Sequence, residues 1–268
     1  MGIRIGELTK WIRPRRLAGG RDSILSGYSI FALALLSGFV SLPILGLALW
    51  TLDENSWQAM TSTIALQALV VTIKTTLVSL IILLFVGTPA AYILARVDFL
   101  GKRVIDTLID IPVVLPPVAA GIALLLALGR MGLLGQYLHF LGIELSFTMA
   151  GVVVAQTFVA LPFYIRPVTS GFERIERDVE DAAMVDGADR VAVFTKITIP
   201  LVLPTLIGSA ISAWARAVGE FGGTIIFAGS FLGVTQTLPV AIYEALERTL
   251  TPQWRLPCWH SASRSQLF

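Results

Sequence analysis

Hydrophobic positions along this chain come in long blocks, separated by short segments in which charged residues, glycine and proline gather. A helix of about 20 residues crosses a hydrocarbon core of about 30 Å, and five of the blocks are close to that length or longer. We expect membrane-spanning helices at residues 24–50, 69–95, 111–128, 148–168 and from residue 201 onward. The pattern therefore predicts an all-α membrane protein, a polytopic bundle of five recognisable spans.

Composition and the distribution of charge agree with this class. Hydrophobic residues make up 55% of the 268 residues and charged residues 14%, whereas about a quarter of a soluble domain is charged. Residues 1–23 carry six Lys or Arg, so the positive-inside tendency predicts a cytoplasmic N-terminus in a cell or inner membrane. The single cysteine, Cys258, excludes an intrachain disulfide framework, and two isolated histidines give no metal site.

A polar segment, residues 173–204, interrupts the hydrophobic pattern and holds 7 of the 18 acidic residues. Mostly small residues recur in it at helical spacing and share one helix face: Ile175, Val179, Ala182 and Ala183. Gly187 can adopt the left-handed conformation that ends such a helix, and Asp189 can cap a second one. We therefore expect a helix, a turn and a second helix that ends at Pro200.

The residues of this segment resemble the signature cytoplasmic loop of the permeases of ABC importers. The order is Asp181-Ala182-Ala183, three residues, Gly187, nine residues, and Ile197-Thr198-Ile199-Pro200. Asp181 stands where this family usually has Glu, and Ile199 where it usually has Leu, so charge or apolar character is kept. A solvated loop helix is the plainer alternative.

The resemblance implies an ABC importer permease fold, in which residues 173–200 form a coupling helix that docks into a groove of a separate ATPase subunit. It implies a role in this coupling for Glu180, Asp181, Ala182, Ala183, Gly187, Ile197 and Pro200. The small side chains of Ala182 and Ala183 would let two backbones approach closely, and an acidic rim would meet basic groups of the partner.

Ionisable and hydroxyl side chains return towards the end of the fifth block. Arg216 and Glu220 are spaced i, i+4, and an ionisable pair at membrane depth is a candidate functional site; the planar fork of Arg also suits oxyanions. Mutual neutralisation of the two charges is an equally open interpretation. The candidates for a translocation pathway are Arg216, Glu220, Thr224, Ser230, Thr235 and Thr237.

The roles of the prolines in the third block and of the lysine in the second block stay open. Pro112, Pro116 and Pro117 in the third block either break a helix that lines a pathway or begin a helix, since Pro is comfortable in a first turn. Lys74, near the outer end of the second block, could line a pathway, but snorkelling of its long stem to the interface is the favoured interpretation.

The stretch at residues 219–247 resembles molybdate and tungstate permeases, and sulfate permeases somewhat less. The matching residues are Gly219-Glu220-Phe221-Gly222, Ala228-Gly229, Thr235-Gln236-Thr237-Leu238-Pro239 and Ala241-Ile242-Tyr243. The resemblance extends over about residues 69–247. It implies a homodimeric transmembrane subunit that imports a tetrahedral oxyanion, molybdate or tungstate, with ATPase subunits and an external binding protein. A permease for sulfate, thiosulfate or another solute is the alternative.

The sequence contains no motif for ATP hydrolysis of its own. None of its four lysines follows the glycine pattern of a phosphate-binding loop, so we expect ATP and Mg on the partner ATPase and no cofactor on this chain. An intramembrane hydrolase is disfavoured, because H-E-x-x-H and G-x-S-x-G motifs are absent. The expected surroundings are the ATPase, the binding protein, a second copy and the lipid membrane, not nucleic acid.

Residues 248–268 depart from the family pattern, which would continue with a last apolar span. They contain three Arg and several Ser and have no apolar run of spanning length. An altered gene end and a genuine five-span variant both fit, and a truncated, non-functional permease is therefore a further alternative. The expected organisation is a basic segment at 1–23, a transmembrane domain at 24–247 and a divergent tail at 248–268.

Overall fold

The computed structural model describes residues 22–50, 58 and 60–250, and every regular element in these ranges is helical. The chain divides into two units, Met1–Met60 and Thr61–Phe268. The first unit contains α1 (Asp22–Trp50), whose large apolar side chains are exposed around the whole helix. Since its most apolar window has a mean hydropathy of 2.3 and no buried residue, α1 needs lipid or another helix around it.

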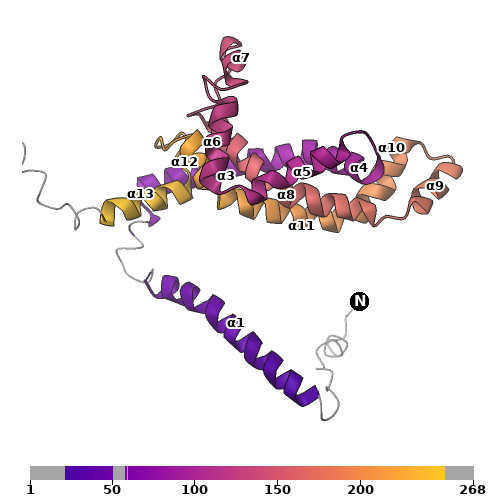
Figure 1. The fold of residues 1–268 in the computed structure, drawn as a ribbon, viewed down its shortest axis with the longest axis horizontal. Helices are drawn as coiled ribbons and strands as arrows, with labels where there is room; N and C mark the ends of the chain where they lie inside the picture. The colour runs from indigo at the N-terminus through magenta and orange to yellow at the C-terminus, as the bar shows by residue number, and fades with distance from the viewer. Residues whose placement is uncertain (1–21, 51–57, 59, 251–268) are drawn as a thin grey trace, which may run out of the picture. The chain divides into compact units, whose positions relative to one another are not determined.

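The second unit is an elongated helical bundle (Figure 1). Its elements, in chain order, are α3 (Thr63–Ile82), the π-helical turn η2 (Leu83–Gly87), α4 (Thr88–Arg96), α5 (Lys102–Val114), α6 (Pro117–Leu128), α7 (Gly135–Phe140), α8 (Met149–Glu173), α9 (Arg177–Val185), α10 (Arg190–Val193), the π-helical turn η3 (Phe194–Thr198), α11 (Ile199–Val218), α12 (Gly222–Phe227) and α13 (Leu238–Leu250).

Long helices form the body of this bundle around α8. The 34 residues from α3 to α4 run on as one helix, about 51 Å long at 1.5 Å per residue. α8 packs against α3, α4, α5, α11 and α12, and its Tyr164 and Phe172 are fully buried in the main hydrophobic cluster. Figure 1 shows α9 and α10 at one end of the bundle, the α9 end, and α12 and α13 at the other, the α12 end.

Four of the five predicted spans are confirmed as single helices long and apolar enough to cross a membrane. They cover Gly27–Leu49, Thr63–Arg96, Met149–Glu173 and Arg190–Val218, and most extend beyond the predicted bounds because polar residues continue the helices past their apolar stretches. Residues 1–21 of the predicted basic segment, and residues 251–268 of the predicted tail, lie outside the described residues.

The third predicted span, 111–128, is not one helix. α5 and α6 are separated by two extended residues, Leu115 and Pro116, because a residue that precedes proline is disfavoured in the helical conformation. Pro117 is the first residue of α6, where its missing N–H costs nothing. Pro116 and Pro117 therefore begin α6, as the start-of-helix interpretation predicted, whereas Pro112 lies inside α5. The single continuous span is wrong.

Glycine lets α8 approach its neighbours closely. A Cβ added at Gly171 would lie 2.8 Å from Val202 Cγ2 and 2.9 Å from Thr205 Cγ2, so α8 and α11 are in tight contact there. Small residues at helix contacts are typical of packing in lipid, where apolar burial alone brings little gain. The small residues of α11 differ in exposure: Ser209 is buried and Gly208 is exposed.

Gly171→Ala should lower the free energy of unfolding by about 1–3 kcal/mol, the usual cost of overpacking. Gly208→Ala is the matched control, because nothing lies within 4 Å of its added Cβ and a helical glycine replaced by alanine gains up to about 1 kcal/mol. Thermal unfolding in detergent measures both variants. Equal effects would mean that α8 and α11 are not in this tight contact.

Candidate coupling and translocation sites

The polar segment at the α9 end folds as a helix, a turn and a second helix. Gly187 adopts the left-handed conformation with φ +94°, and Asp189 Oδ1 accepts a hydrogen bond of 2.7 Å from the Ala192 backbone N–H at the start of α10. The predicted helix stop and helix cap are both confirmed. The loop is thus closed by local chemistry that is readable in the sequence.

The second helix does not end at Pro200, as the sequence analysis expected. α10, η3 and α11 continue as one helix of 29 residues, Arg190–Val218. The π-helical turn η3 ends two residues before Pro200, and such a turn accommodates a helix position that lacks a backbone donor. Ile197 is half-buried in this helix and Pro200 is exposed on it, so neither lies in a separate loop.

Glu180 lies inside the bundle and not on the exposed acidic rim that the sequence analysis expected. Only 9% of this residue is exposed. Its Oε1 accepts a hydrogen bond of 3.1 Å from Arg96 Nη2 and another of 2.8 Å from Thr198 Oγ1. A buried carboxylate requires such partners, and the three residues come from α9, α4 and η3. Glu180 therefore anchors α9 on the bundle.

Arg96 fixes the start of α9 as well. Its Nη1 donates to the Ile175 carbonyl oxygen at 3.0 Å, and Arg177 Nη2 donates in turn to the Arg96 carbonyl oxygen at 3.2 Å. The sequence analysis did not identify Arg96 or Thr198. No sequence signal pairs Arg96 with a residue 84 positions away, although a basic residue at the end of a span is a general candidate for such a role.

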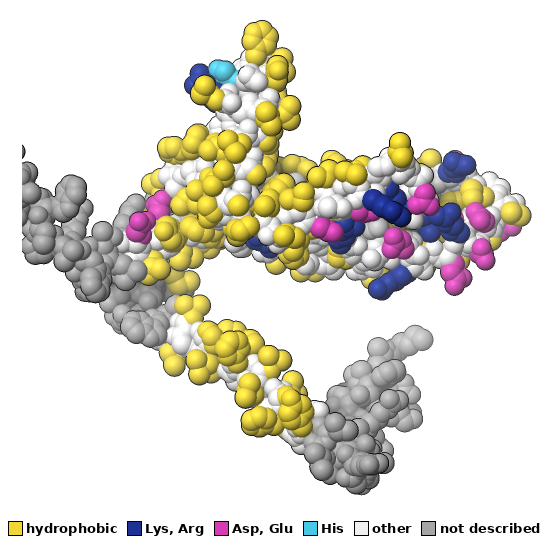
Figure 2. Space-filling model, in the orientation of Figure 1, with side chains coloured by type: hydrophobic (Ala, Val, Ile, Leu, Met, Phe, Trp, Pro, Cys, Tyr) yellow, Lys and Arg dark blue, Asp and Glu magenta, His cyan; other side chains and the backbone are white. Residues whose placement is uncertain are grey.

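The outer face of α9 is free of these anchors and presents a mixed surface. Asp181 and Ala182 are exposed and Ala183 is half-buried, while Val185 is 87% exposed. Figure 2 shows charged side chains of both signs gathered at this end of a molecule that is otherwise mainly hydrophobic on the visible face. Apolar residues within a charged rim are typical of a protein interface.

A further carboxylate of this end lies in the turn between α4 and α5. Lys102 Nζ donates to Asp98 Oδ1 at 3.0 Å, and this hydrogen bond, with the charge of Lys102, lowers the pKa of Asp98. Asp98 therefore stays ionised at neutral pH and adds to the charged rim.

At the α12 end, the predicted pair of Arg216 and Glu220 is formed. Arg216 Nη1 lies 3.2 Å from Glu220 Oε2, and Glu220 Oε1 accepts a hydrogen bond of 2.7 Å from the Gly223 backbone N–H. Glu220 is 1% exposed. Both of its oxygens are thus engaged within the chain, which favours the interpretation that the two charges neutralise each other.

The four predicted hydroxyl residues do not share one environment. Thr235 Oγ1 accepts a hydrogen bond of 2.9 Å from the Phe231 backbone N–H and so stabilises the loop before α13. The buried hydroxyls of Thr224, Ser230 and Thr237 have no hydrogen-bond partner within the described part of the chain. Buried hydroxyls normally have a partner, so each of these three keeps an unused donor for a water or a ligand. No hydrogen bond or ion pair links them to Arg216 within the described ranges.

A row of hydroxyls on α3 was missed by the sequence analysis. Thr72 Oγ1 accepts a hydrogen bond of 2.8 Å from the Leu238 backbone N–H, and Thr76 Oγ1 accepts one of 3.2 Å from Trp214 Nε1. Ser79 Oγ donates to the Val153 carbonyl oxygen at 3.1 Å. These residues join α3 to α13, α11 and α8. Their recurrence at helical spacing inside an apolar block was the available signal.

An ionic clamp between α5 and α8 was also missed. The Arg166 guanidinium donates from Nε and Nη2 to the two oxygens of Asp110, at 2.7 and 2.8 Å, and from Nη1 to Asp106 Oδ1 at 2.9 Å. Such bidentate geometry is a strong form of Arg–carboxylate pairing. The i, i+4 spacing of the two aspartates on one helix face was the signal.

Glu180→Ala should lower the free energy of unfolding by roughly 3 kcal/mol, because it leaves the buried Arg96 charge without its partner. Asp181→Ala, at the exposed neighbouring position, should change it by less than about 0.5 kcal/mol. Unfolding of the solubilised protein measures both. In a double-mutant cycle, Arg96→Ala with Glu180→Ala should cost less than the sum of the single changes; strict additivity would contradict the pairing.

Residues 87–251 match the family described as the binding-protein-dependent transport system inner membrane component. The chain is 40% identical over 214 residues to the molybdenum transport system permease protein ModB of Mycobacterium tuberculosis, which covers 80% of each chain. It is 34% identical to the probable sulfate transport system permease protein cysT of Chlorokybus atmophyticus, over 77% of this chain and 73% of that one.

A solved structure has the same fold. It is that of a bacterial ABC transporter involved in the import of the acidic polysaccharide alginate, with a TM-score of 0.59 and 17% identity over 92% of this chain and 88% of that chain. The fold and the family expected from the polar segment are confirmed. The chain belongs to the family of inner membrane components of binding-protein-dependent transport systems.

Proposed function

We propose that this chain is the transmembrane subunit of an ATP-driven importer for a tetrahedral oxyanion, with molybdate as its first substrate. The observation that carries the proposal is the 40% identity to a molybdenum permease across 80% of both chains. Tungstate has the same charge and geometry and is the nearest alternative. Sulfate is the second candidate, supported by the lower identity of 34% to a sulfate permease.

The chain contributes transport, and a separate ATPase subunit contributes energy. ATP and Mg bind to that subunit, and the surface it meets is the outer face of α9. Asp181, Ala182 and Ala183 are the contact residues, because they are on or near the surface and a small residue allows close approach of two backbones. Glu180 serves by positioning α9, through Arg96 and Thr198.

Both the N-terminus and the α9 end face the cytoplasm. The basic residues in 1–23 favour this side for the N-terminus, and passage through α1 and then through the helix of Thr63–Arg96 returns the chain to the same side at Arg96. Arg96 contacts α9 directly. The α12 end is then external, where a binding protein delivers the anion.

The working unit is a homodimer in lipid. In the second unit, α11 keeps large apolar side chains such as Ile207, Ile211 and Trp214 on its exposed side, and these need lipid or a second subunit. Two copies would also place two α9 surfaces opposite two ATPase subunits, so that closure of the ATPase pair moves both. Two-fold symmetry is the commonest arrangement of homo-oligomers.

The pathway at the α12 end offers neutral donors. Transfer of a dianion from water to a low dielectric has a high free-energy cost. Its passage also requires a site that binds it weakly enough to release it. The hydroxyls of Thr224, Ser230 and Thr237, which have no hydrogen-bond partner among the described residues, are suitable donors. Arg216 adds positive charge that Glu220 already balances in part, so these groups form no tight permanent anion site.

Gly187→Ala should reduce stimulation of the ATPase by loaded binding protein about tenfold, a typical size for coupling between two sites. The change strains the left-handed turn beside α9, with φ +94° and no atom near the new Cβ. Gly142→Ala is the matched control, since Gly142 has φ +76° and equally open surroundings at the other end.

Each of the two changes should cost about 1–2 kcal/mol of stability, so their comparison separates strain from coupling. Copurification of the ATPase and its rate with and without molybdate-loaded binding protein are the measurements. An equal loss in both variants, or no loss at Gly187, would contradict a coupling role for the turn.

A further inference from the structure

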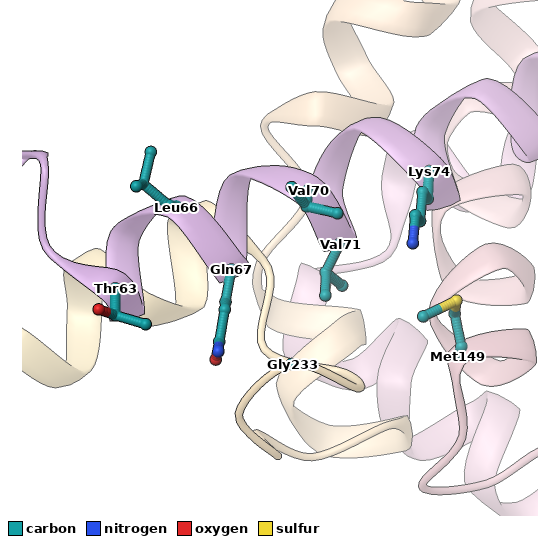
Figure 3. Close-up of a pocket in the computed structure, with 8 residues that line it drawn as sticks. All are labelled: Thr63, Leu66, Gln67, Val70, Val71, Lys74, Met149 and Gly233. Carbon is teal, nitrogen blue, oxygen red and sulfur yellow. The ribbon is translucent and has the colours of Figure 1, made fainter.

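A hollow of about 280 Å³ lies beside the first half of α3, near the α12 end. It is lined by α3 residues from Thr63 to Lys74, by the first residue of α8, Met149, and by Gly233 in the loop before α13. Figure 3 shows Lys74 and Gln67 projecting from α3 on the side of Met149 and of the Gly233 loop. A water occupies about 30 Å³ of liquid, so the hollow has room for a small hydrated anion.

Among the described residues that line the hollow, Lys74 is the only charged one. Within the described ranges no carboxylate lies within 4.0 Å of its ammonium group, since none of the ion pairs there includes Lys74. Most of the other lining residues are apolar, such as Leu66 and Val70. Lys74 is exposed, and an unbalanced cation beside mostly apolar residues attracts anions to the hollow.

Lys74 is exposed on α3, and the snorkelling of its stem that the sequence analysis favoured stays a prediction. Lys74 lies 11 residues after Thr63, the first residue of α3, or about 16 Å along the helix axis. The hollow extends along the same turns, from Thr63 to Lys74, so water and small solutes reach the ammonium group where it lies.

Polar groups around Lys74 are suited to hold an oxyanion. The side chain of Gln67 lies beside the Gly233 loop, its Oε1 3.6 Å from a Cβ built on Gly233, and the amide of Gln67 carries two donors. The first turn of α8 adds backbone N–H groups that have no partner within their own helix. Of these, the N–H of Gly151 is already bonded to Thr148 Oγ1 at 3.2 Å.

We propose that this hollow is an external receiving site for the oxyanion, with Lys74 as its charge and Gln67 as its main neutral donor. The inference rests on the proposed function, because it requires that anions arrive at the α12 end. One positive charge against a dianion makes the site weak, as a site through which substrate passes must be. The anion would leave it for the hydroxyls of Thr224, Ser230 and Thr237.

Lys74→Met tests the site, because methionine keeps an apolar stem and removes the charge. Lys74→Arg keeps the charge and is the matched control. Each is assembled with the ATPase and the binding protein in liposomes, and molybdate uptake is measured over a range of concentrations of loaded binding protein. Thermal shift of the solubilised complex by molybdate, without binding protein, measures anion binding directly.

We expect Lys74→Met to lower the maximal uptake rate about tenfold, the factor that loss of one charge-assisted hydrogen bond gives, and to abolish the thermal shift. Lys74→Arg should stay within about twofold of the parent. Unchanged uptake and thermal shift in Lys74→Met would overturn the proposal.

Two further outcomes separate the site from its alternatives. If Lys74→Met raises only the concentration of binding protein for half-maximal uptake, Lys74 meets a carboxylate of that protein and the receiving site is wrong. If the parent complex transports no oxyanion, the proposed function fails by itself. The thermal shift then still decides whether Lys74 binds an anion.

Discussion

The buried contact of Glu180 with Arg96 and Thr198 is the constraint on which the α9 end depends. A carboxylate with so little exposure needs a cation and a hydrogen-bond donor. The cation is Arg96, 84 positions earlier in the chain, and the donor is the hydroxyl of Thr198, 18 positions later. One oxygen of Glu180 accepts both hydrogen bonds and so ties α9 to α4 and to the α10–α11 helix at a single point. A force applied to the outer face of α9 therefore acts on both helices together.

The helix of Arg190–Val218 gives that force a path to the other end. Its 29 residues span about 43 Å at 1.5 Å per residue. It carries Thr198 near one end and Arg216 near the other. Gly171 lets α8 pack closely against this helix on the way. A rigid element that touches both sites is the physical requirement for coupling between them, and this helix meets it.

The local features of the coupling segment could be predicted because their causes lie within a few residues. Gly187 and Asp189 end and begin helices by their own backbone and side-chain chemistry. Five apolar blocks were long enough to be recognised as spans, and four of them are single helices of spanning length. The burial of Glu180 could not be predicted in this way. It depends on Arg96, 84 positions earlier in the chain. An acidic residue in a charged segment is expected to be exposed unless its basic partner is known.

At the α12 end the same limit applies. The i, i+4 spacing predicted the contact of Arg216 with Glu220, but which hydroxyls keep a free donor depends on the loop that folds around them. Thr235 supports that loop, while Thr237, two residues later, has no partner among the described residues. Pro112, Pro116 and Pro117 predicted a break without its position, since a proline both ends and begins helices.

Site-specific cross-linking tests the central claim, that the outer face of α9 meets the ATPase. In a background with Cys258→Ser, the exposed Ala182 is changed to Cys and the assembled complex is treated with a short thiol-to-amine reagent. Leu141→Cys, 70% exposed near the other end, is the control. The account predicts a cross-linked product with the ATPase subunit from Ala182→Cys, with a yield that changes on addition of ATP, and none from Leu141→Cys. No product from Ala182→Cys, or equal products from both positions, would contradict it.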